Sequence, residues 1–478
     1  MTAQDPFVLF GLLAALVHVL GCVSAVDAIL KARTSQGAIA WAITLAILPY
    51  LALPLYWAFG QRKFHGYVRA RQSGDREVRG LVESLSRHTP ELPGATPSER
   101  SAVQAAERLA GLPFTDGNTA RLLIDGRATF DAIFDAIDEA RDYILVQFYM
   151  VRADRIGREL QARLIRKAME GVRVYLLYDE IGSLGLPGTY IAELRDGGVD
   201  VSGYKVTKGR RKRTQLNFRN HRKIVVVDGQ RAYVGGLNVG DEYLGHDPRI
   251  GPWRDTSVAI EGPAVEGIQL SFVEDWYWAN RAVPRLNLTP APARSGDKKI
   301  LVLASGPADP FETYSLFVIQ AAFAARRRLW IVSPYFVPDI DVMAALQLAG
   351  LRGVDVRIML PERSDNLLVG LASESYFAPA ERAGIEIFRY RSGFLHQKVM
   401  LIDDDIATVG TANMDNRSFR LNFELTLLII DRAFAGDMER MLEADFARCS
   451  RLSPAETQGR SFAFRLAVRT ARLFAPVL

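Results

Sequence analysis

Two stretches of the chain carry the same residues at the same spacing: Asn220-His-Arg-Lys-Ile-Val-Val-Val-Asp228 and Leu395-His-Gln-Lys-Val-Met-Leu-Ile-Asp403. In both, a lysine lies two residues after the histidine, and an aspartate lies five residues after the lysine. An asparagine follows ten residues later, Asn238 in the first stretch and Asn413 in the second. The whole chain has only 6 histidines, so chance is a poor explanation for the repetition. The pattern predicts a duplicated strand with polar residues at its start.

The segments around each stretch also repeat one order of elements. Both halves show a strand, a helix, a second strand and then a glycine-led strand. These segments are residues 144–150, 157–170, 171–177 and 198–201 in the first half, and 329–336, 343–351, 353–360 and 384–387 in the second. Strands and helices that alternate at close spacing favour right-handed crossovers. The sequence therefore predicts an α/β fold with a parallel or mixed sheet covered by helices.

The polar residues of the two stretches suit chemistry on a phosphate group. Side chains two residues apart in a strand share a face, so His221 should point with Lys223, and His396 with Lys398. If the two copies meet, their lysines and asparagine amides would stabilise the charge on a five-coordinate phosphorus. One imidazole could then attack while the other protonates the leaving oxygen. An ordinary histidine pKa near 6.5 makes both protonation states accessible at neutral pH.

The aspartates of the pattern have two possible roles. Asp228 and Asp403 come just before apparent hairpin turns, so they are expected to fix the turn or tether a lysine. Direct acid–base work is the alternative. With it included, the candidate catalytic residues are His221, Lys223, Asp228, His396, Lys398 and Asp403, and the candidate phosphate-binding residues are Asn238 and Asn413.

Length and composition exclude several classes of protein. The 478 residues predict two or three domains, and 49% hydrophobic residues are enough for a sizeable core. Only 2 cysteines are present, which excludes a disulfide scaffold and a cysteine-based zinc module. The histidines show no paired ligand spacing either, so we expect neither a metal nor another cofactor. Without a Gly-x-x-x-x-Gly-Lys loop or a Gly-x-Ser-x-Gly elbow, an ATPase or a serine esterase is disfavoured.

The N-terminus carries two long apolar segments. Residues 7–26 contain no formal charge, and residues 37–60 contain none either. Each is long enough for a bilayer core, so together they predict a helical hairpin in a membrane. Basic residues are denser after the second segment than between the two, which favours a cytoplasmic location for the rest of the chain. A cleaved signal peptide and a pair of buried soluble helices are the alternatives; the first lacks a basic n-region.

With these residues in view, the chain resembles a known family. The doubled His-x-Lys-x4-Asp pattern, followed by Gly235-Gly-Leu-Asn238 and Gly410-Thr-Ala-Asn413, is similar to that of the phospholipase D superfamily. The N-terminal hairpin and the stretches 240–245, 253–256 and 413–424 add a resemblance to the bacterial cardiolipin synthases. That resemblance covers the chain from about Phe7 onward and is least distinctive past Ser450.

The resemblance implies an activity and a role for each site residue. A phosphatidyl group would pass from one phosphatidylglycerol to another with release of glycerol, through a phosphohistidine and without a metal. His221 would be the nucleophile and His396 the general acid, while the two lysines and two asparagines hold the phosphate. Asp255 would orient His221, and Glu424 would orient His396. The alternative for these two carboxylates is a simple ion pair with Arg254 and Arg420.

The resemblance also implies a domain organisation. We expect a transmembrane hairpin at 1–65, a linker at 66–105, and two phospholipase D-like α/β/α repeats at 106–290 and 291–478. The repeats would be related by a pseudo-twofold axis and would share one active site. The implied location is the bacterial inner membrane, with several passes and a cytoplasmic catalytic part. The implied partners are phosphatidylglycerol and other anionic lipids, with no nucleic acid; the oligomeric state is left open.

A basic insert and the choice of acceptor leave alternatives open. The first repeat has about eleven residues more than the second before its histidine, with 6 basic residues at 205–213. This loop would attract anionic headgroups, but it would attract nucleic acid as well, and it could also be a solvated loop without a specific role. Besides the phosphatidyltransferase, we therefore weigh a hydrolase, transfer to another alcohol, a nuclease of the same superfamily and a non-catalytic scaffold.

Overall fold

The computed structural model describes residues 6–31, 35–60, 97–204, 217–247, 251–286, 293, 295–453 and 460–478. It divides into two compact units, residues 1–64 with 205–218 and residues 65–204 with 219–478. Most of the predicted linker and all of the predicted basic loop at 205–213 lie outside the described residues.

The described residues of the N-terminal unit form three helices, α1 (Pro6–Lys31), α2 (Ser35–Ile47) and α3 (Pro49–Phe59). Among the described helices, α1 alone is both long and apolar enough to cross a bilayer, with a mean hydropathy of 2.4 over its most apolar window. The second apolar segment is not one helix, because Pro49 has no backbone N–H to continue α2 and begins α3 instead. The predicted pair of spanning helices is therefore not confirmed.

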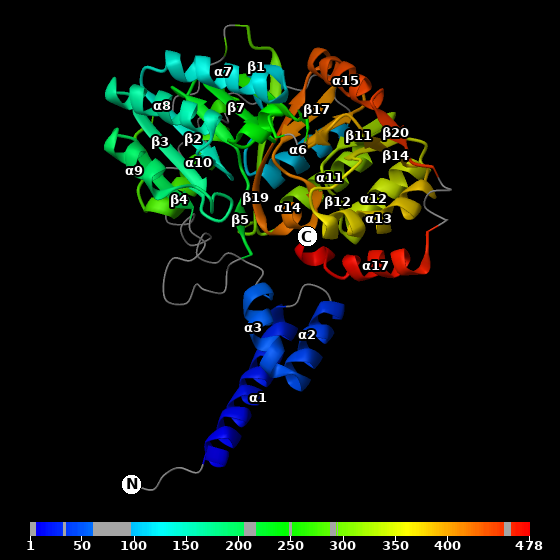
Figure 1. The fold of residues 1–478 in the computed structure, drawn as a ribbon. Coiled ribbons are helices and arrows are strands. Elements are labelled where there is room, and N and C mark those ends of the chain that lie inside the picture. Colours follow the sequence, from blue (N-terminus) through cyan, green and yellow to red (C-terminus); the bar gives the residue numbers. More distant parts are fainter. Residues whose placement is uncertain are drawn as a thin grey trace. The chain divides into compact units, whose positions relative to one another are not determined.

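A long mixed sheet forms the centre of the second unit (Figure 1). Its strands from the first half of the chain are β1 (Thr115–Ile124), β2 (Tyr143–Phe148), β3 (Arg173–Asp179), β4 (Asp200–Tyr204), β5 (Arg219–Asn220), β6 (Ile224–Val227), β7 (Arg231–Gly235) and β9 (Thr256–Glu261). Those from the second half are β10 (Lys298–Ser305), β11 (Arg328–Val332), β13 (Asp355–Pro361), β14 (Glu386–Tyr390), β16 (Val399–Ile402), β17 (Ile406–Gly410), β19 (Asn422–Ile430) and β20 (Cys449–Arg451). Two further pairs of short strands are β8 (Trp253–Arg254) with β15 (Phe394–Leu395), and β12 (Phe336–Val337) with β18 (Met414–Asp415).

Most helices of the second unit lie along this sheet (Figure 1). Those from the first half are α6 (Pro97–Ala110), α7 (Asp125–Glu139), α8 (Arg155–Met169), α9 (Gly188–Asp196) and α10 (Ala264–Asn280), with a 3₁₀ turn η2 (Asp241–Leu244). Those from the second half are α11 (Thr313–Ala324), α12 (Ile340–Leu351), α13 (Leu367–Glu381), α14 (Asn416–Arg420), α15 (Arg432–Phe446) and α17 (Phe462–Arg472), with a 3₁₀ turn η3 (Ala475–Val477). Of these, α17 lies along α13 rather than along the sheet. The predicted α/β class is confirmed.

The two halves of the chain place their strands in the same order from the middle of the sheet outward. β1 and β10 are antiparallel neighbours at the centre. On one side follow β9, β7, β6, β2, β3 and β4, and on the other β19, β17, β16, β11, β13 and β14, with β20 beyond. β2, β3 and β4 run parallel to one another, as do β11, β13 and β14. Equivalent strands of the two halves therefore occupy equivalent places.

The apolar part of each histidine stretch forms an interior strand. All four residues of β6 are buried, and so are all four of β16. β6 lies between β2 and β7, and β16 lies between β11 and β17. Strands buried on both faces favour continuous runs of branched apolar residues, which is what these two segments contain. The core thus fixes where each preceding histidine and lysine must lie.

Asp228 and Asp403 lie at the opposite end of these strands from the histidines. The Asp228 carboxylate accepts hydrogen bonds from the backbone N–H groups of Arg141, Asp142 and Tyr143 at the start of β2. Asp403 does the same for residues 326–328 at the start of β11. Both have a left-handed backbone, with φ of 54° and 51°. The prediction that groups Asp228 and Asp403 with the catalytic residues is corrected, because the length of a strand separates them from the histidines. Both aspartates fix turns instead.

We expect Asp228→Ala and Asp403→Ala each to lower the free energy of unfolding by about 2 kcal/mol, because three backbone donors lose their charged acceptor. Thermal or urea unfolding measures this change. Asp131→Ala is the matched control, since Asp131 makes only an exposed ion pair with Arg127. A variant at 228 or 403 that keeps its stability but loses turnover would restore the catalytic interpretation.

Candidate active site

The two histidines are held by short strands that join the halves of the chain. β5 runs parallel to the start of β19, and the His221 N–H donates to the Phe423 carbonyl at 2.9 Å. β8 runs parallel to β15, and the His396 N–H donates to the Arg254 carbonyl at 2.8 Å. Each histidine is therefore placed by a strand from the other half.

This crossing decides which carboxylate orients which histidine. His221 Nδ1 lies 2.9 Å from Glu424 Oε2, and His396 Nδ1 lies 2.8 Å from Asp255 Oδ2. The predicted assignment, with Asp255 on His221 and Glu424 on His396, is wrong. The register of the short strand pairs explains the observed partners. Asn220 is paired with Phe423, which places Glu424 beside His221. Leu395 is paired with Arg254, which places Asp255 beside His396.

Neither carboxylate is merely the partner of a neighbouring arginine. Arg254 binds Asp445 and Asp125, and Arg420 binds Glu312 and Asp339. Because a carboxylate can only accept, its partner nitrogen must donate, so each imidazole carries its proton on Nδ1 and leaves Nε2 with a lone pair.

The Glu424 carboxylate is completely buried and held by three more donors. Thr411 Oγ1 donates to it at 2.6 Å and Ser418 Oγ at 2.8 Å, while Asn422 Nδ2 lies at 3.2 Å. Burial alone would raise the pKa of Glu424, but the facing His221 and the nearby Lys223 hold that pKa below its ordinary value. Glu424 therefore stays ionised beside His221.

Asp255 is held differently. It accepts from the backbone N–H of Thr256 at 2.8 Å and lies against Gly236, whose missing side chain makes room for it. A Cβ at position 236 would come within 2.3 Å of Asp255 Oδ1. Burial raises the pKa of Asp255 to about 6, although Lys398 opposes this change. Gly236 and Thr411 occupy equivalent positions in the two stretches. Gly236 makes room for Asp255, whereas Thr411 donates a hydrogen bond to Glu424.

Both histidines are neutral at pH 7 in the free protein. Burial lowers the pKa of His221 to about 4, although Glu424 opposes this. Burial also lowers the pKa of His396 well below 6.5, and the positive charges of Lys398 and Lys223 act in the same direction.

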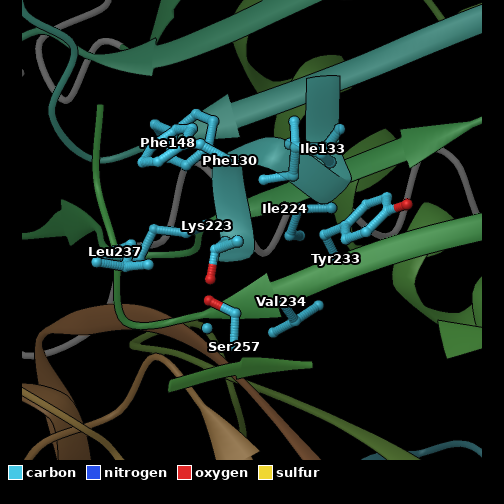
Figure 2. Close-up of a pocket in the computed structure, with 12 residues that line it drawn as sticks. Phe130, Ile133, Phe148, Lys223, Ile224, Tyr233, Val234, Leu237 and Ser257 are labelled. Atoms are coloured by element: carbon cyan, nitrogen blue, oxygen red, sulfur yellow. The ribbon is translucent and has the colours of Figure 1, made fainter. Parts of the chain in front are cut away.

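The two lysines are buried beside the histidines. Lys223 Nζ donates to the His221 carbonyl at 2.6 Å, and Lys398 Nζ donates to the His396 carbonyl at 2.5 Å. Lys223 also borders a small cavity whose walls are mainly apolar, with Phe130, Ile133, Phe148 and Leu237 among them (Figure 2). Burial lowers the pKa of Lys223 to about 7 and that of Lys398 to about 8. An arriving anion would hold both in the charged form.

Both predicted asparagines are buried, and their amides are held in place. Asn238 Nδ2 donates to the Tyr243 hydroxyl at 2.9 Å, and its Oδ1 accepts from the Met150 N–H. Asn413 Nδ2 lies 3.3 Å from Asp415 Oδ2, while the buried Asn413 Oδ1 has no hydrogen-bond partner among the described residues.

Aromatic residues that the sequence analysis did not select also border the site. The Tyr149 ring meets His221 edge-on at 5.2 Å between centroids, and Trp253 lies 5.0 Å from His396. Tyr149 is the first residue after β2, and Tyr335 is the third after β11, where its hydroxyl donates to Asp365 at 2.8 Å. A tyrosine shortly after each of the two equivalent strands is the signal that could have identified both.

The residue between each histidine and lysine was also missed. Arg222 Nη1 binds the buried Asp275 of α10 at 2.9 Å, and Gln397 Nε2 binds the buried Asp445 of α15 at 2.9 Å. Each motif is thereby anchored to a helix of its own half, while its histidine is bound to the other. Among the described residues, no group of three or more histidine, cysteine, aspartate or glutamate side chains could hold a metal ion.

Comparison with known proteins identifies the family of the chain. The family model described as cardiolipin synthase, PLD-like domain, matches residues 133–248 and 318–446, one segment around each histidine. Cardiolipin synthase A of Pseudomonas putida is 50% identical over 483 aligned residues, which cover 100% of both chains. Cardiolipin synthase A of Pseudomonas entomophila is 48% identical with the same coverage.

The chain belongs to the cardiolipin synthase family. Its fold is also found beyond this family. The crystal structure of phosphatidylserine synthase from Haemophilus influenzae matches with a TM-score of 0.61 and 16% identity, over 79% of this chain and 100% of that one. At such low identity the likeness concerns the fold alone. In this chain, the two carboxylate–histidine pairs that cross between the halves hold the site together.

We expect Gly236→Ala to lower turnover by about 10- to 100-fold, because its Cβ would displace the carboxylate that orients His396. Gly185→Ala is the control, since a Cβ there would meet nothing within 4 Å. Steady-state rates of the two variants, with far-UV circular dichroism for the fold, measure the difference. Equal rates for both would mean that the contact between Asp255 and His396 has no part in turnover.

Proposed function

We propose that this chain is a phosphatidyltransferase that makes cardiolipin from two molecules of phosphatidylglycerol and releases glycerol. Its membership of the cardiolipin synthase family supports the enzyme class. The observation that carries the mechanism is the crossed pairing, which fixes Nδ1 of both histidines on carboxylates and leaves both Nε2 atoms for a substrate. Two lysines, two asparagine amides and two imidazoles would then contact one phosphodiester.

In the first step, the neutral His221 Nε2 attacks the phosphorus of the first phosphatidylglycerol. A P–N bond forms and the P–O bond to the glycerol headgroup breaks. The leaving oxygen takes a proton from His396, so free glycerol departs. The ionised Glu424 stabilises the positive charge that develops on His221, which is why we assign the attack to this histidine rather than to His396.

In the second step, the neutral His396 accepts the proton of a glycerol hydroxyl from the second phosphatidylglycerol. The deprotonated oxygen attacks the phosphorus, and the P–N bond to His221 breaks. Cardiolipin leaves, His221 is neutral again, and His396 holds the proton that it donates in the next first step or releases when the site empties. Lys223, Lys398, Asn238 and Asn413 would stabilise the phosphoryl oxygens in both steps. Atoms and protons balance without a metal or another cofactor.

Proton uptake must accompany binding of the first substrate. His396 is neutral in the free protein, because burial and the two lysines lower its pKa. The phosphodiester adds a negative charge beside it, which favours the imidazolium form. Substrate binding would thus prepare the general acid, and the unoccupied site would hold two neutral bases.

We also propose the finer organisation implied by the sequence. Residues 106–290 and 291–478 would be two repeats related by a pseudo-twofold axis, supported by the equivalent order of their strands. Residues 1–65 would anchor the chain in the bacterial inner membrane, with the catalytic part in the cytoplasm. For this anchor, α1 provides the clearest support. Several membrane passes would require α2 and α3 together to complete a second span.

The decisive experiment is incubation of the purified full-length protein with phosphatidylglycerol and EDTA, followed by separation of the lipids. We expect cardiolipin and glycerol in equal amounts, with the rate unchanged by EDTA. His221→Ala should abolish both products. Phosphatidic acid as the main product would show that water is the second acceptor, and a rate restored only by a divalent ion would contradict the mechanism.

The roles of the two histidines can be separated with an activated substrate. p-Nitrophenyl phosphatidate has a leaving group that needs no general acid. With it, His396→Ala should release one equivalent of nitrophenol and retain a covalent phosphatidyl group on the protein. His221→Ala should release none. The reverse result would assign the nucleophile to His396.

We expect kcat/KM to be highest in a narrow range near neutral pH. The lowered pKa values of Lys223, about 7, and Lys398, about 8, mean that both lose their charge well below the ordinary lysine value as the pH rises. On the acid side, the Asp255–His396 pair takes up a proton as the pH falls through about 6. A pH profile of kcat/KM measures both limbs. Because Lys223 loses its charge first, Lys223→Arg should move the alkaline limb upward, toward the pKa of Lys398; an unmoved limb would show that Lys223 does not set it.

A further inference from the structure

The helix α17 (Phe462–Arg472) lies along α13 (Figure 1). Ser461 caps its start, since the Ser461 hydroxyl accepts from the Phe464 N–H at 3.2 Å. Val468 and Ala471 are buried on the side that meets the protein. The guanidinium group of Arg472 lies over the Tyr376 ring of α13 at 5.1 Å. One face of α17 is therefore fixed to the second unit.

A second face of α17 is apolar and exposed. Phe462, Leu466 and Leu473 have exposed fractions of 73%, 56% and 78%. At 3.6 residues per turn these three side chains fall within one narrow stripe, about 40° wide. Phe474, just after the helix, is also half-exposed. We call this the apolar stripe of α17, and the described part of the protein leaves it open to its surroundings.

A third face of α17 is basic. Arg465 and Arg469 are exposed and lie between the apolar stripe and the buried face. From residue 460 to 478 the chain has four arginines and no aspartate or glutamate. An exposed stripe of phenylalanine and leucine with arginine along its border is typical of helices that lie in the surface of an anionic bilayer.

We propose that α17 is such a helix and binds the surface of a membrane rich in anionic phospholipid. The apolar stripe would enter the boundary between headgroups and acyl chains, and Arg465 and Arg469 would bind lipid phosphates. This contact is separate from the spanning helix α1 and from the active site. It would hold the catalytic unit itself against the bilayer that contains its substrate, and it does not depend on which reaction the site performs.

Charge and apolarity together select this partner. A nucleic acid would use the arginines but gain nothing from exposed phenylalanine and leucine. A protein partner would match the apolar stripe, but it would need a strongly acidic border as well. An anionic bilayer satisfies both requirements with a single surface.

The test places a fluorescent label on the apolar stripe of the full-length protein. In a Cys22→Ser, Cys449→Ser background, Leu466→Cys carries bimane, and the protein is reconstituted in phosphatidylcholine vesicles with or without phosphatidylglycerol. Lipids brominated on their acyl chains quench the label only if it enters the bilayer. We expect at least twofold quenching in vesicles that contain phosphatidylglycerol. Met169→Cys, exposed at the end of α8, is the matched control and should remain unquenched.

The charge requirement is tested in the same vesicles. Arg465→Gln and Arg469→Gln should each lower the ratio of bound to free helix about fivefold, at about 1 kcal/mol per arginine, and high salt should act likewise. The proposal fails if position 466 is not quenched or if position 169 is quenched equally. It also fails if the emission shifts to the blue without quenching, which would mean that protein covers the stripe. None of these signals requires turnover, so they stand apart from any failure of the proposed reaction.

Discussion

Two hydrogen bonds that cross between the halves of the chain determine the rest of the site. Each joins the Nδ1 of one histidine to a buried carboxylate from the other half, Glu424 for His221 and Asp255 for His396. Short parallel strand pairs set the register of these bonds. The tautomer, the direction of each imidazole and the position of the free nitrogen follow from them. The continuous sheet through β1 and β10 keeps the two crossings in place.

Burial is the second constraint, and it explains why this site favours the binding of an anion. Two lysines and two histidines lie close together in a region from which water is largely removed, so charge on any one of them is costly. Burial accordingly lowers the pKa of all four. A bound phosphodiester would offset the cost of positive charge on the two lysines, so the arrangement favours a negatively charged ligand.

The sequence was sufficient for the α/β fold class, and it placed both histidine–lysine pairs in one duplicated pattern, because these depend on local spacing; the catalytic roles of those residues stay a prediction. Ile224–Val227 and Val399–Ile402 could be identified as buried strands from their apolar runs alone. The partners of Asp255 and Glu424 could not, because they depend on a register between strands that are far apart in the chain. The broken second apolar segment, with Pro49 in it, shows a similar limit: length and lack of charge do not reveal where a helix ends. The amphipathic character of α17 is visible in the sequence, but the repeated motifs do not point to it because they lie elsewhere in the chain.

The crossed pairing also links activity to assembly. A half that folded alone would have its lysine and histidine, but no carboxylate to set the tautomer of that histidine. If the proposed roles hold, a newly synthesised chain would not acquire a competent nucleophile until its second half has been completed and docked on the first. An enzyme that cleaves membrane lipids as part of its cycle is thereby kept silent during its own synthesis, without a separate inhibitor.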